Sequence, residues 1–238
     1  MQLFHIEPNN IRVKWDNIEV FSVPELISQL CKVLRVKKWD KICVQFSDNK
    51  WTTRYELSIQ NRTDQDLTGE IISTQTFSFH ERNISMLIAM PNKREKAELI
   101  VQKLTEIWAS NICFWTSEHS IIRQRNKKKE ERLNKVLKEA VEQSWGTWLP
   151  TIRFLYSDDE LINFINWKKT IIANIWWLTY WKVLNHIEAD TCWVVWPEWW
   201  LSEKDLKLFN NADIIDLWTN VLRMETASII LAWLLKNI

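Results

Sequence analysis

Residues Val194–Ser202 read V-V-W-P-E-W-W-L-S, and this stretch determines how the C-terminal part of the chain is interpreted. It begins with the end of a short apolar run, which is typical of a buried strand. It finishes with Ser202, a residue type that favours the start of a helix. Backbone N–H groups in a turn between strand and helix can reach a ligand at the edge of a sheet. We therefore expect a ligand-binding loop here.

Three tryptophans occupy this turn, where small residues are expected. Glycine adopts the backbone angles of tight turns, whereas an indole gains nothing there. The 238 residues include 17 Trp and only 2 Gly, although an average chain of this length has on the order of 17 glycines. We therefore hypothesise that most tryptophans occupy glycine positions, as they would if UGA codons are read as glycine. The alternative is a truly tryptophan-rich protein whose indoles stack on bases or sugars.

Other tryptophans also occupy positions where the sequence predicts a turn or the end of a helix. Trp39 lies in Lys-Lys-Trp-Asp between two strand-like runs, and Trp108 follows the helical pattern Lys96–Ile107. Glycine is common at the first position beyond a helix. Trp115 and Trp148 are our candidates for genuine tryptophan.

The composition is that of an ordinary globular protein, 46% hydrophobic and 26% charged, with a net charge of +1. This length is comfortable for two domains or one large one. We find no apolar run of about 18 residues that would predict a membrane helix, and no pattern typical of a signal peptide. The four cysteines and four histidines have no metal-ligand spacing, so we expect no metal and a reducing, cytoplasmic location.

Residues 1–73 read as a small β-barrel, because short apolar runs alternate with turn-like clusters. A helix interrupts them, with Ser22 as its expected N-cap and an apolar face that includes Val33. The expected strands are Ile11–Val13, Ile18–Phe21, Lys41–Phe46, Arg54–Ile59 and Glu70–Thr74.

Residues 74–238 alternate strands with helices, which predicts an α/β domain with a mostly parallel sheet. The expected strands are Met86–Met90, Asn111–Phe114, Ile152–Leu155, Thr170–Ile175, Cys192–Val195 and Ile214–Leu217. The expected helices are Lys93–Ile107, Lys127–Ser144, Asp158–Asn166, Ser202–Asn210 and Met224–Leu235.

A second motif follows the opening stretch: residues Asp216–Ala227 read D-L-W-T-N-V-L-R-M-E-T-A. With glycine restored, the two motifs resemble the GPEGG loop and the LG-x-x-(I/L)LR-x-ETA segment of the RsmE-type ribosomal RNA uridine-N3 methyltransferase family. Shorter matches extend the resemblance over nearly the whole chain: Cys31–Asp40 to VLR…GD, Lys93–Trp108 to K-x-x-x-x-E…QK-x-x-ELG, Ser117–Ser120 to SERS, and Glu139–Trp145 to EA-x-EQSG. Two positions depart from the family, because His119 and Gly146 stand where arginine is usual.

The resemblance implies a PUA- or OB-like β-barrel before a SPOUT trefoil-knot domain, whose mostly parallel sheet carries helices on both faces. It also implies a homodimer that binds S-adenosylmethionine (SAM) and methylates uridine N3 in 16S ribosomal RNA of the small subunit. Two alternatives stay open. One is another SPOUT methyltransferase that acts on transfer RNA or on 2′-O-ribose, and the other is an RNA-binding paralogue without a cofactor site.

The resemblance assigns the cofactor to three loops. The first contributes Val195, Trp196, Pro197, Glu198, Trp199 and Trp200; the second contributes Leu217, Trp218, Val221, Leu222, Arg223 and Thr226; the third, after the strand Thr170–Ile175, contributes Ile175 and Trp176. Glycine at the tryptophan positions leaves room for SAM, whereas indoles would fill that space.

Two residues are candidates for the chemistry. Uridine N3 is protonated at neutral pH, so methylation needs a base or a cation that stabilises the uridine anion. Arg223 is the candidate cation, and the alternative is that it pairs with Glu198 or Glu225. Glu198 is the candidate base, and the alternative is that it holds its loop by accepting backbone N–H bonds.

RNA binding is assigned to basic residues, several of them in the segment Ile121–Lys138, which has a local balance of +6. Such a segment can neutralise phosphates, although a solvated helix face is the alternative. The candidates are Arg35, Lys38, Lys93, Arg94, Arg123, Arg125, Lys127, Lys128 and Lys129.

Overall fold

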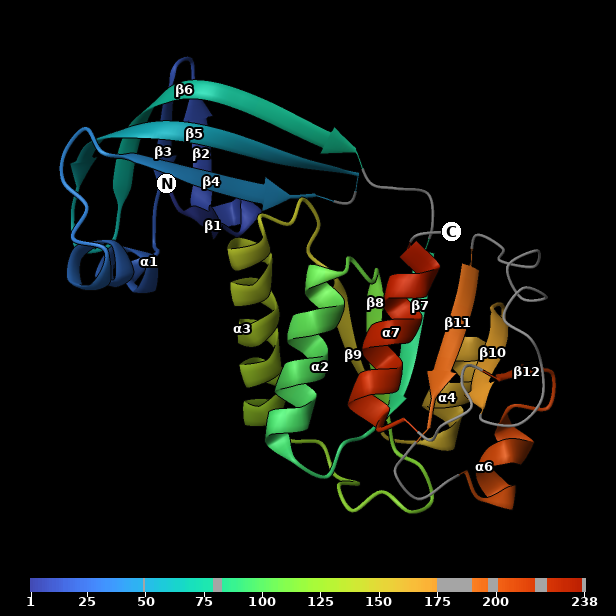
Figure 1. Cartoon of the computed structure of the whole chain (residues 1–238). Helices are drawn as coiled ribbons and strands as arrows, with labels where there is room; N and C mark the ends of the chain where they lie inside the picture. Colours follow the sequence, from blue (N-terminus) through green and yellow to red (C-terminus); the bar gives the residue numbers. More distant parts are fainter. Residues whose placement is uncertain (49, 79–82, 175–189, 197–200, 217–221, 237–238) are drawn as a thin grey trace. The chain divides into compact units, whose positions relative to one another are not determined.

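The computed structural model describes residues 1–48, 50–78, 83–174, 190–196, 201–216 and 222–236 (Figure 1). The chain forms two compact units. Unit 1 contains Met1–Phe79 and Val141–Trp148, and unit 2 contains His80–Ala140 and Leu149–Ile238.

Unit 1 is built on a curved six-stranded sheet with the order β1-β4-β5-β6-β3-β2 (Figure 1). Its pairings are antiparallel except for β1 with β4. The strands are β1 (Leu3–His5), β2 (Ile11–Lys14), β3 (Asn17–Val20), β4 (Lys41–Ser47), β5 (Trp51–Arg62) and β6 (Leu67–Ser78); the helical segments are η1 (Pro8–Asn10), α1 (Pro24–Ser28) and η2 (Gln29–Val33).

The five expected strands of this unit are confirmed, and the structure differs from the expectation only in details. The sequence pattern missed β1, and β5 and β6 are longer than expected. Ser22 is not the N-cap of α1: Val23 holds that position, and Ser22 has a positive φ of 57°. Val33 is the last residue of the π-helical segment η2 and is 71% exposed, so its predicted place on the apolar face was wrong.

The segment after α3 packs within unit 1 through a buried arginine. Arg54 in β5 donates to the carbonyl oxygens of Trp145 and Gly146 at 3.1 and 3.3 Å. Gln45 in β4 donates to the same Gly146 oxygen at 2.9 Å. Burial lowers the pKa of Arg54, yet these oxygen acceptors compensate for part of the lost hydration. Hydrogen bonds therefore join Val141–Trp148 to the sheet of unit 1.

Unit 2 contains a wholly parallel six-stranded sheet with the order β12-β10-β11-β7-β8-β9. This confirms the expected α/β class. Its elements are β7 (Asn83–Ala89), α2 (Arg94–Glu106), β8 (Asn111–Trp115), α3 (Lys127–Ser144), β9 (Thr151–Leu155), α4 (Asp158–Ile165), β10 (Lys169–Asn174), β11 (Asp190–Val195), α6 (Glu203–Leu208), β12 (Asp213–Asp216) and α7 (Met224–Lys236).

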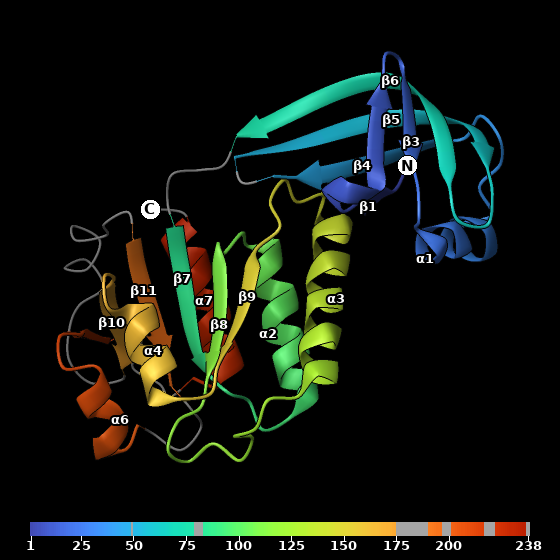
Figure 2. The ribbon, with the colours of Figure 1, turned by 180° about the vertical axis from the view of Figure 1, so that it is seen from behind.

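Helices cover both faces of this sheet. Helices α2, α3 and α7 lie on one face (Figure 1), and α4 lies on the other (Figure 2). The central strands are therefore buried on both sides, which explains their continuous apolar runs. Residues Met86–Ala89 are completely buried, and Cys192–Val195 are at most 2% exposed.

The backbone supports the hypothesis that tryptophan occupies glycine positions. Six described non-glycine residues have a positive φ, and four of them are Trp15, Trp39, Trp108 and Trp145, at 52°, 74°, 70° and 55°. A side chain in this region clashes with its own backbone, at a cost of roughly 1–2 kcal/mol. Glycine has no Cβ and is free of this cost.

The hydrogen bonds at the end of α2 also indicate a position that favours glycine. The N–H of Ala109 donates to the carbonyl of Leu104 at 3.0 Å, and the N–H of Trp108 donates to that of Thr105 at 3.1 Å. This pair of bonds is the Schellman motif, whose left-handed position is usually glycine. Trp108 holds that position, as the sequence pattern indicated.

We predict that Trp15→Gly raises the free energy of unfolding by about 0.5–1 kcal/mol. The substitution removes the strain of the left-handed backbone, and part of this gain is lost because glycine has more conformational entropy in the unfolded chain. Trp15 is 96% exposed and begins the two-residue turn between β2 and β3, so its indole contributes little packing. Urea unfolding measures the change. Trp167→Gly is the control, because Trp167 is 93% exposed without a positive φ. Equal effects at both positions would contradict the strain argument.

Candidate functional site

The three strands that precede the expected cofactor loops end side by side at the carboxyl edge of the parallel sheet. Asn174 at the end of β10 is paired with Asp216 at the end of β12. Ile172 in β10 is paired with Val194 in β11. The chain therefore leaves β10, β11 and β12 at adjacent places on one edge.

This edge contains a topological switch point, where the chain continues to strands on opposite sides of β7. From β7 the chain proceeds to β8 and β9 on one side, whereas β11 and β10 lie on the other. Ligands of open α/β sheets bind in the crevice outside the carboxyl ends of strands at such a point. Val195, the last residue of β11, is paired with Ile88 of β7 and is 2% exposed. The first cofactor loop thus begins at the switch.

Most of the expected cofactor residues lie outside the described residues: Ile175, Trp176, Pro197, Glu198, Trp199, Trp200, Leu217, Trp218 and Val221. Of the remainder, Trp196 is half-buried and packs against the core of unit 2. Its indole occupies volume next to the end of β11 that a glycine would leave empty.

Arg223, the candidate cation, lies at the start of α7. Its side chain is exposed, and its carbonyl accepts the N–H of Ala227 at 2.9 Å. Glu225, one of its expected alternative partners, pairs instead with Lys96 of α2, at 3.6 Å between Oε2 and Nζ. Leu222 is half-buried and Thr226 is exposed. The contact between Lys96 and Glu225 holds α7 against α2, and Arg223 forms no ion pair with a described residue.

A buried carboxylate connects two loops of the same edge. Asp205, 2% exposed, accepts the N–H of Glu118 at 3.0 and 3.3 Å from its two oxygens. It also accepts the N–H of Ser202 at 3.2 Å, while Ser202 Oγ accepts the N–H of Asp205 at 3.0 Å. Ser202 is the N-cap of α6, as expected. Asp205 was not among the expected site residues, although the S-x-x-D spacing from Ser202 is typical of a capping box.

The loop after β8 is a closed turn. The N–H of Ser117 donates to Ser120 Oγ at 3.0 Å, and the hydroxyls of the two serines are also 3.0 Å apart. Arg123 donates to the carbonyl of Ser120 at 3.1 Å and to that of Glu118. This arginine, expected to bind RNA, thus binds two carbonyl oxygens of its own segment.

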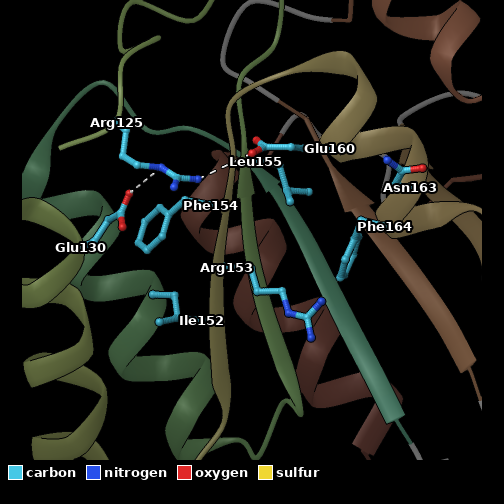
Figure 3. A pocket seen from close by; sticks show the side chains of 9 residues that line it. All are labelled: Arg125, Glu130, Ile152, Arg153, Phe154, Leu155, Glu160, Asn163 and Phe164. Carbon is cyan, nitrogen blue, oxygen red and sulfur yellow. Dashed lines mark ion pairs between the residues drawn. The ribbon is translucent and has the colours of Figure 1, made fainter. Parts of the chain in front are cut away.

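Arg125 is engaged in ion pairs. Its guanidinium lies 3.8 Å from Glu130 and 3.6 Å from Glu160, and above the ring of Tyr156. Figure 3 shows it between the two glutamates. It lines an open groove of about 520 Å³ beside β9, the last strand of the sheet. Because β7 and β8 separate β9 from β11, the groove is apart from the expected cofactor loops.

The three lysines that begin α3 differ in environment. The ammonium of Lys129 is half-buried and contacts Met90 Sδ at 3.5 Å, and desolvation lowers its pKa. Lys127 and Lys128 are exposed. Of the expected RNA-binding residues in this segment, these two retain the most accessible charge.

The other expected RNA-binding residues are exposed. Lys38 lies over the ring of Trp39 at 4.9 Å, and Arg35 has a positive φ of 53°. Arg94 pairs with Glu98 at 3.5 Å while its side chain stays 71% exposed, and Lys93 precedes α2.

The chain matches the model of the RNA methyltransferase domain family over residues 80–236. The chain belongs to this family. In sequence it is 27% identical, over 168 residues, to ribosomal RNA small subunit methyltransferase E of Bacillus subtilis (strain 168), a match that covers 68% of this chain and 63% of that protein.

Solved structures show the same fold. One is a ribosomal RNA small subunit methyltransferase E from Neisseria gonorrhoeae bound to S-adenosyl methionine, with TM-score 0.83, 19% identity, and coverage of 100% of this chain and 97% of that chain. Another is a putative methyltransferase from Legionella pneumophila with bound SAM, with TM-score 0.79, 18% identity, and coverage of 100% and 97%. No described helix is long and apolar enough to cross a membrane.

We predict that replacing both Lys127 and Lys128 by alanine lowers the salt dependence of RNA binding. Each phosphate contact contributes roughly 0.7–0.9 to the slope of log K against log salt, so the slope should fall by about 1.5. A filter-binding titration of a ribosomal RNA fragment measures it. Lys204→Ala is the control, because Lys204 already pairs with Asp158 at 3.1 Å; an unchanged slope in the double variant would remove these lysines from the RNA surface.

Proposed function

We propose that this protein transfers a methyl group from SAM to uridine N3 in 16S ribosomal RNA of the small subunit. The observation that carries the proposal is the register of β10, by which the three strands that precede the expected cofactor loops end at one sheet edge. Membership in an RNA methyltransferase family agrees with it. The solved structures with bound SAM also agree with it, because they have the same fold, although their SAM was observed in those proteins and not in this one.

The residues of the site fit SAM if glycine stands in the loops. Methyl transfer from a sulfonium is an in-line displacement, so the protein has to place donor and acceptor and exclude water. Backbone groups of glycine-rich turns can approach the adenosyl part closely. We refer to the chain with glycine at 176, 196, 199, 200 and 218 as the glycine form, and to the printed sequence as the tryptophan form.

We predict that the glycine form binds SAM with a dissociation constant between about 1 μM and 1 mM, the usual range for substrates of enzymes. The tryptophan form is expected to bind none, because five indoles would occupy the loops. Isothermal titration calorimetry measures both. The tryptophan form with Trp167→Gly controls for the removal of an indole elsewhere, and failure of the glycine form to bind would refute the enzymatic proposal.

Within this proposal Arg223 stabilises the uridine anion. It is exposed beside the second cofactor loop, its side chain has no ion pair with a described residue, and its neighbour Glu225 is engaged by Lys96. A positioned cation near developing negative charge contributes to the rate of the chemical step. Glu198 remains our proposed base.

We predict that the glycine form converts uridine to 3-methyluridine in small subunits that lack the modification, as read by nucleoside mass spectrometry. Arg223→Ala is expected to lower kcat by roughly 10²–10³, the effect of losing one stabilising group, with SAM binding retained. Arg223→Lys, which keeps the charge, should retain part of the rate. A 2′-O-methylated nucleoside, or methylation of transfer RNA instead, would favour the alternative SPOUT activities.

We also propose that the protein acts as a homodimer, as the family resemblance implies. Light scattering of the purified glycine form tests this, and a monomeric mass would contradict it. An RNA-binding paralogue without cofactor remains the alternative function if the authentic protein carries indoles in the loops.

A further inference from the structure

We propose that Asp205 is a positioning residue, which fixes the loop after β8 to the loop after β11 and thereby sets the affinity for SAM. The inference rests on the proposed function, because the loop after β11 is the first cofactor loop. Its basis is one carboxylate that accepts N–H bonds from both loops, through Glu118 and Ser202.

The burial of Asp205 requires these bonds. At 2% exposure the carboxylate has lost nearly all of its hydration, which is costly unless donors replace the water. The N–H groups of Glu118 and Ser202 are such donors, and bonds to a charged acceptor are stronger than bonds between neutral groups. Because the carboxylate needs both donors, it keeps the two backbone segments at a fixed separation.

The loop after β8 is anchored at further points. Thr116 donates its N–H to the carbonyl of Leu155 in β9 at 3.1 Å. Arg123 binds the carbonyls of Ser120 and Glu118 from the other side. Asp205 therefore attaches its own loop to a turn that is already held, so that the turn serves as a fixed support.

The turn after β8 supports the C-terminal end of the proposed cofactor loop. Ser202 comes two residues after Trp200, and Leu201 between them is buried at 8% exposure. A glycine-rich loop has few side chains with which to hold its own shape. Asp205 holds Ser202, the residue at which the expected loop meets α6.

Asp205→Asn breaks this connection with little change of volume. The amide keeps one acceptor oxygen but places an NH₂ donor where the second oxygen was, so at least one backbone N–H loses its acceptor. Ser202→Ala is the matched control. It removes the acceptor for the N–H of Asp205 and weakens the start of α6, but it leaves the bonds from Asp205 to both loops.

The experiment compares these variants in the glycine form. We expect Asp205→Asn to raise the dissociation constant and KM for SAM about tenfold, the size of one hydrogen bond to a charged acceptor, with a smaller change in kcat. Ser202→Ala should stay within about twofold of the parent, since the loss is less than that of such a bond. Equal weakening in the two variants would show a merely structural role and overturn the proposal.

Amide hydrogen exchange without SAM provides an independent measurement. Asp205→Asn should speed exchange at Glu118, whereas Ser202→Ala should speed it at Asp205 and leave Glu118 unchanged. Unchanged exchange at Glu118 in Asp205→Asn would show that the connection is absent. If the parent glycine form binds no SAM, the proposed function fails, while the exchange data still decide whether Asp205 joins the loops.

Discussion

The site depends on the parallel register of β10 with its two neighbours. Hydrogen bonds to β11 and β12 place Ile172 beside Val194 and Ile214, so the three following loops leave the sheet together. A slip by one residue would displace a loop by about 3.3 Å along the strand. Close packing on both faces, with Ile171, Ile172 and Val194 at most 1% exposed, opposes such a slip. The core therefore fixes the positions at which the loops start.

If tryptophan occupies glycine positions, glycine would have two different roles in this chain. At Trp15, Trp39, Trp108 and Trp145 the backbone has left-handed angles that glycine adopts without strain. In the expected cofactor loops, the proposed function requires space for SAM and a close approach of the backbone to it. The first role follows from hydrogen-bonded geometry, as in the Schellman motif after α2. Both roles are explained if UGA codons are read as glycine.

Local periodicity predicted most of the fold. Apolar runs identified the strands of unit 2, because burial on both faces leaves a continuous signal. The three-residue strand β1 is too short to show alternation. The place of Val141–Trp148 in unit 1 was also out of reach, because it depends on Arg54 and Gln45, about a hundred residues away in sequence. No local pattern carries such a contact.

The strands that precede the three expected loops were predicted, and the environments of the charges expected to bind RNA were not. A count of basic residues treats Arg123, Arg125 and Lys127 alike. In the structure the first binds backbone carbonyls, the second lies between two carboxylates, and the third is exposed. Pairing depends on which side chains the fold brings within a few ångströms, which composition does not contain.

A carboxylate is suited to joining the two loops. Apolar packing could connect them only through apolar side chains, and residues Thr116–Ser120 after β8 have none. Their backbone N–H groups are directional donors, so an acceptor that serves both loops fixes distance and orientation together. Asp205 is suited to this because its own helix begins at Ser202, and the capping box holds the carboxylate in place. A capping interaction and a connection between loops are thus made by one side chain.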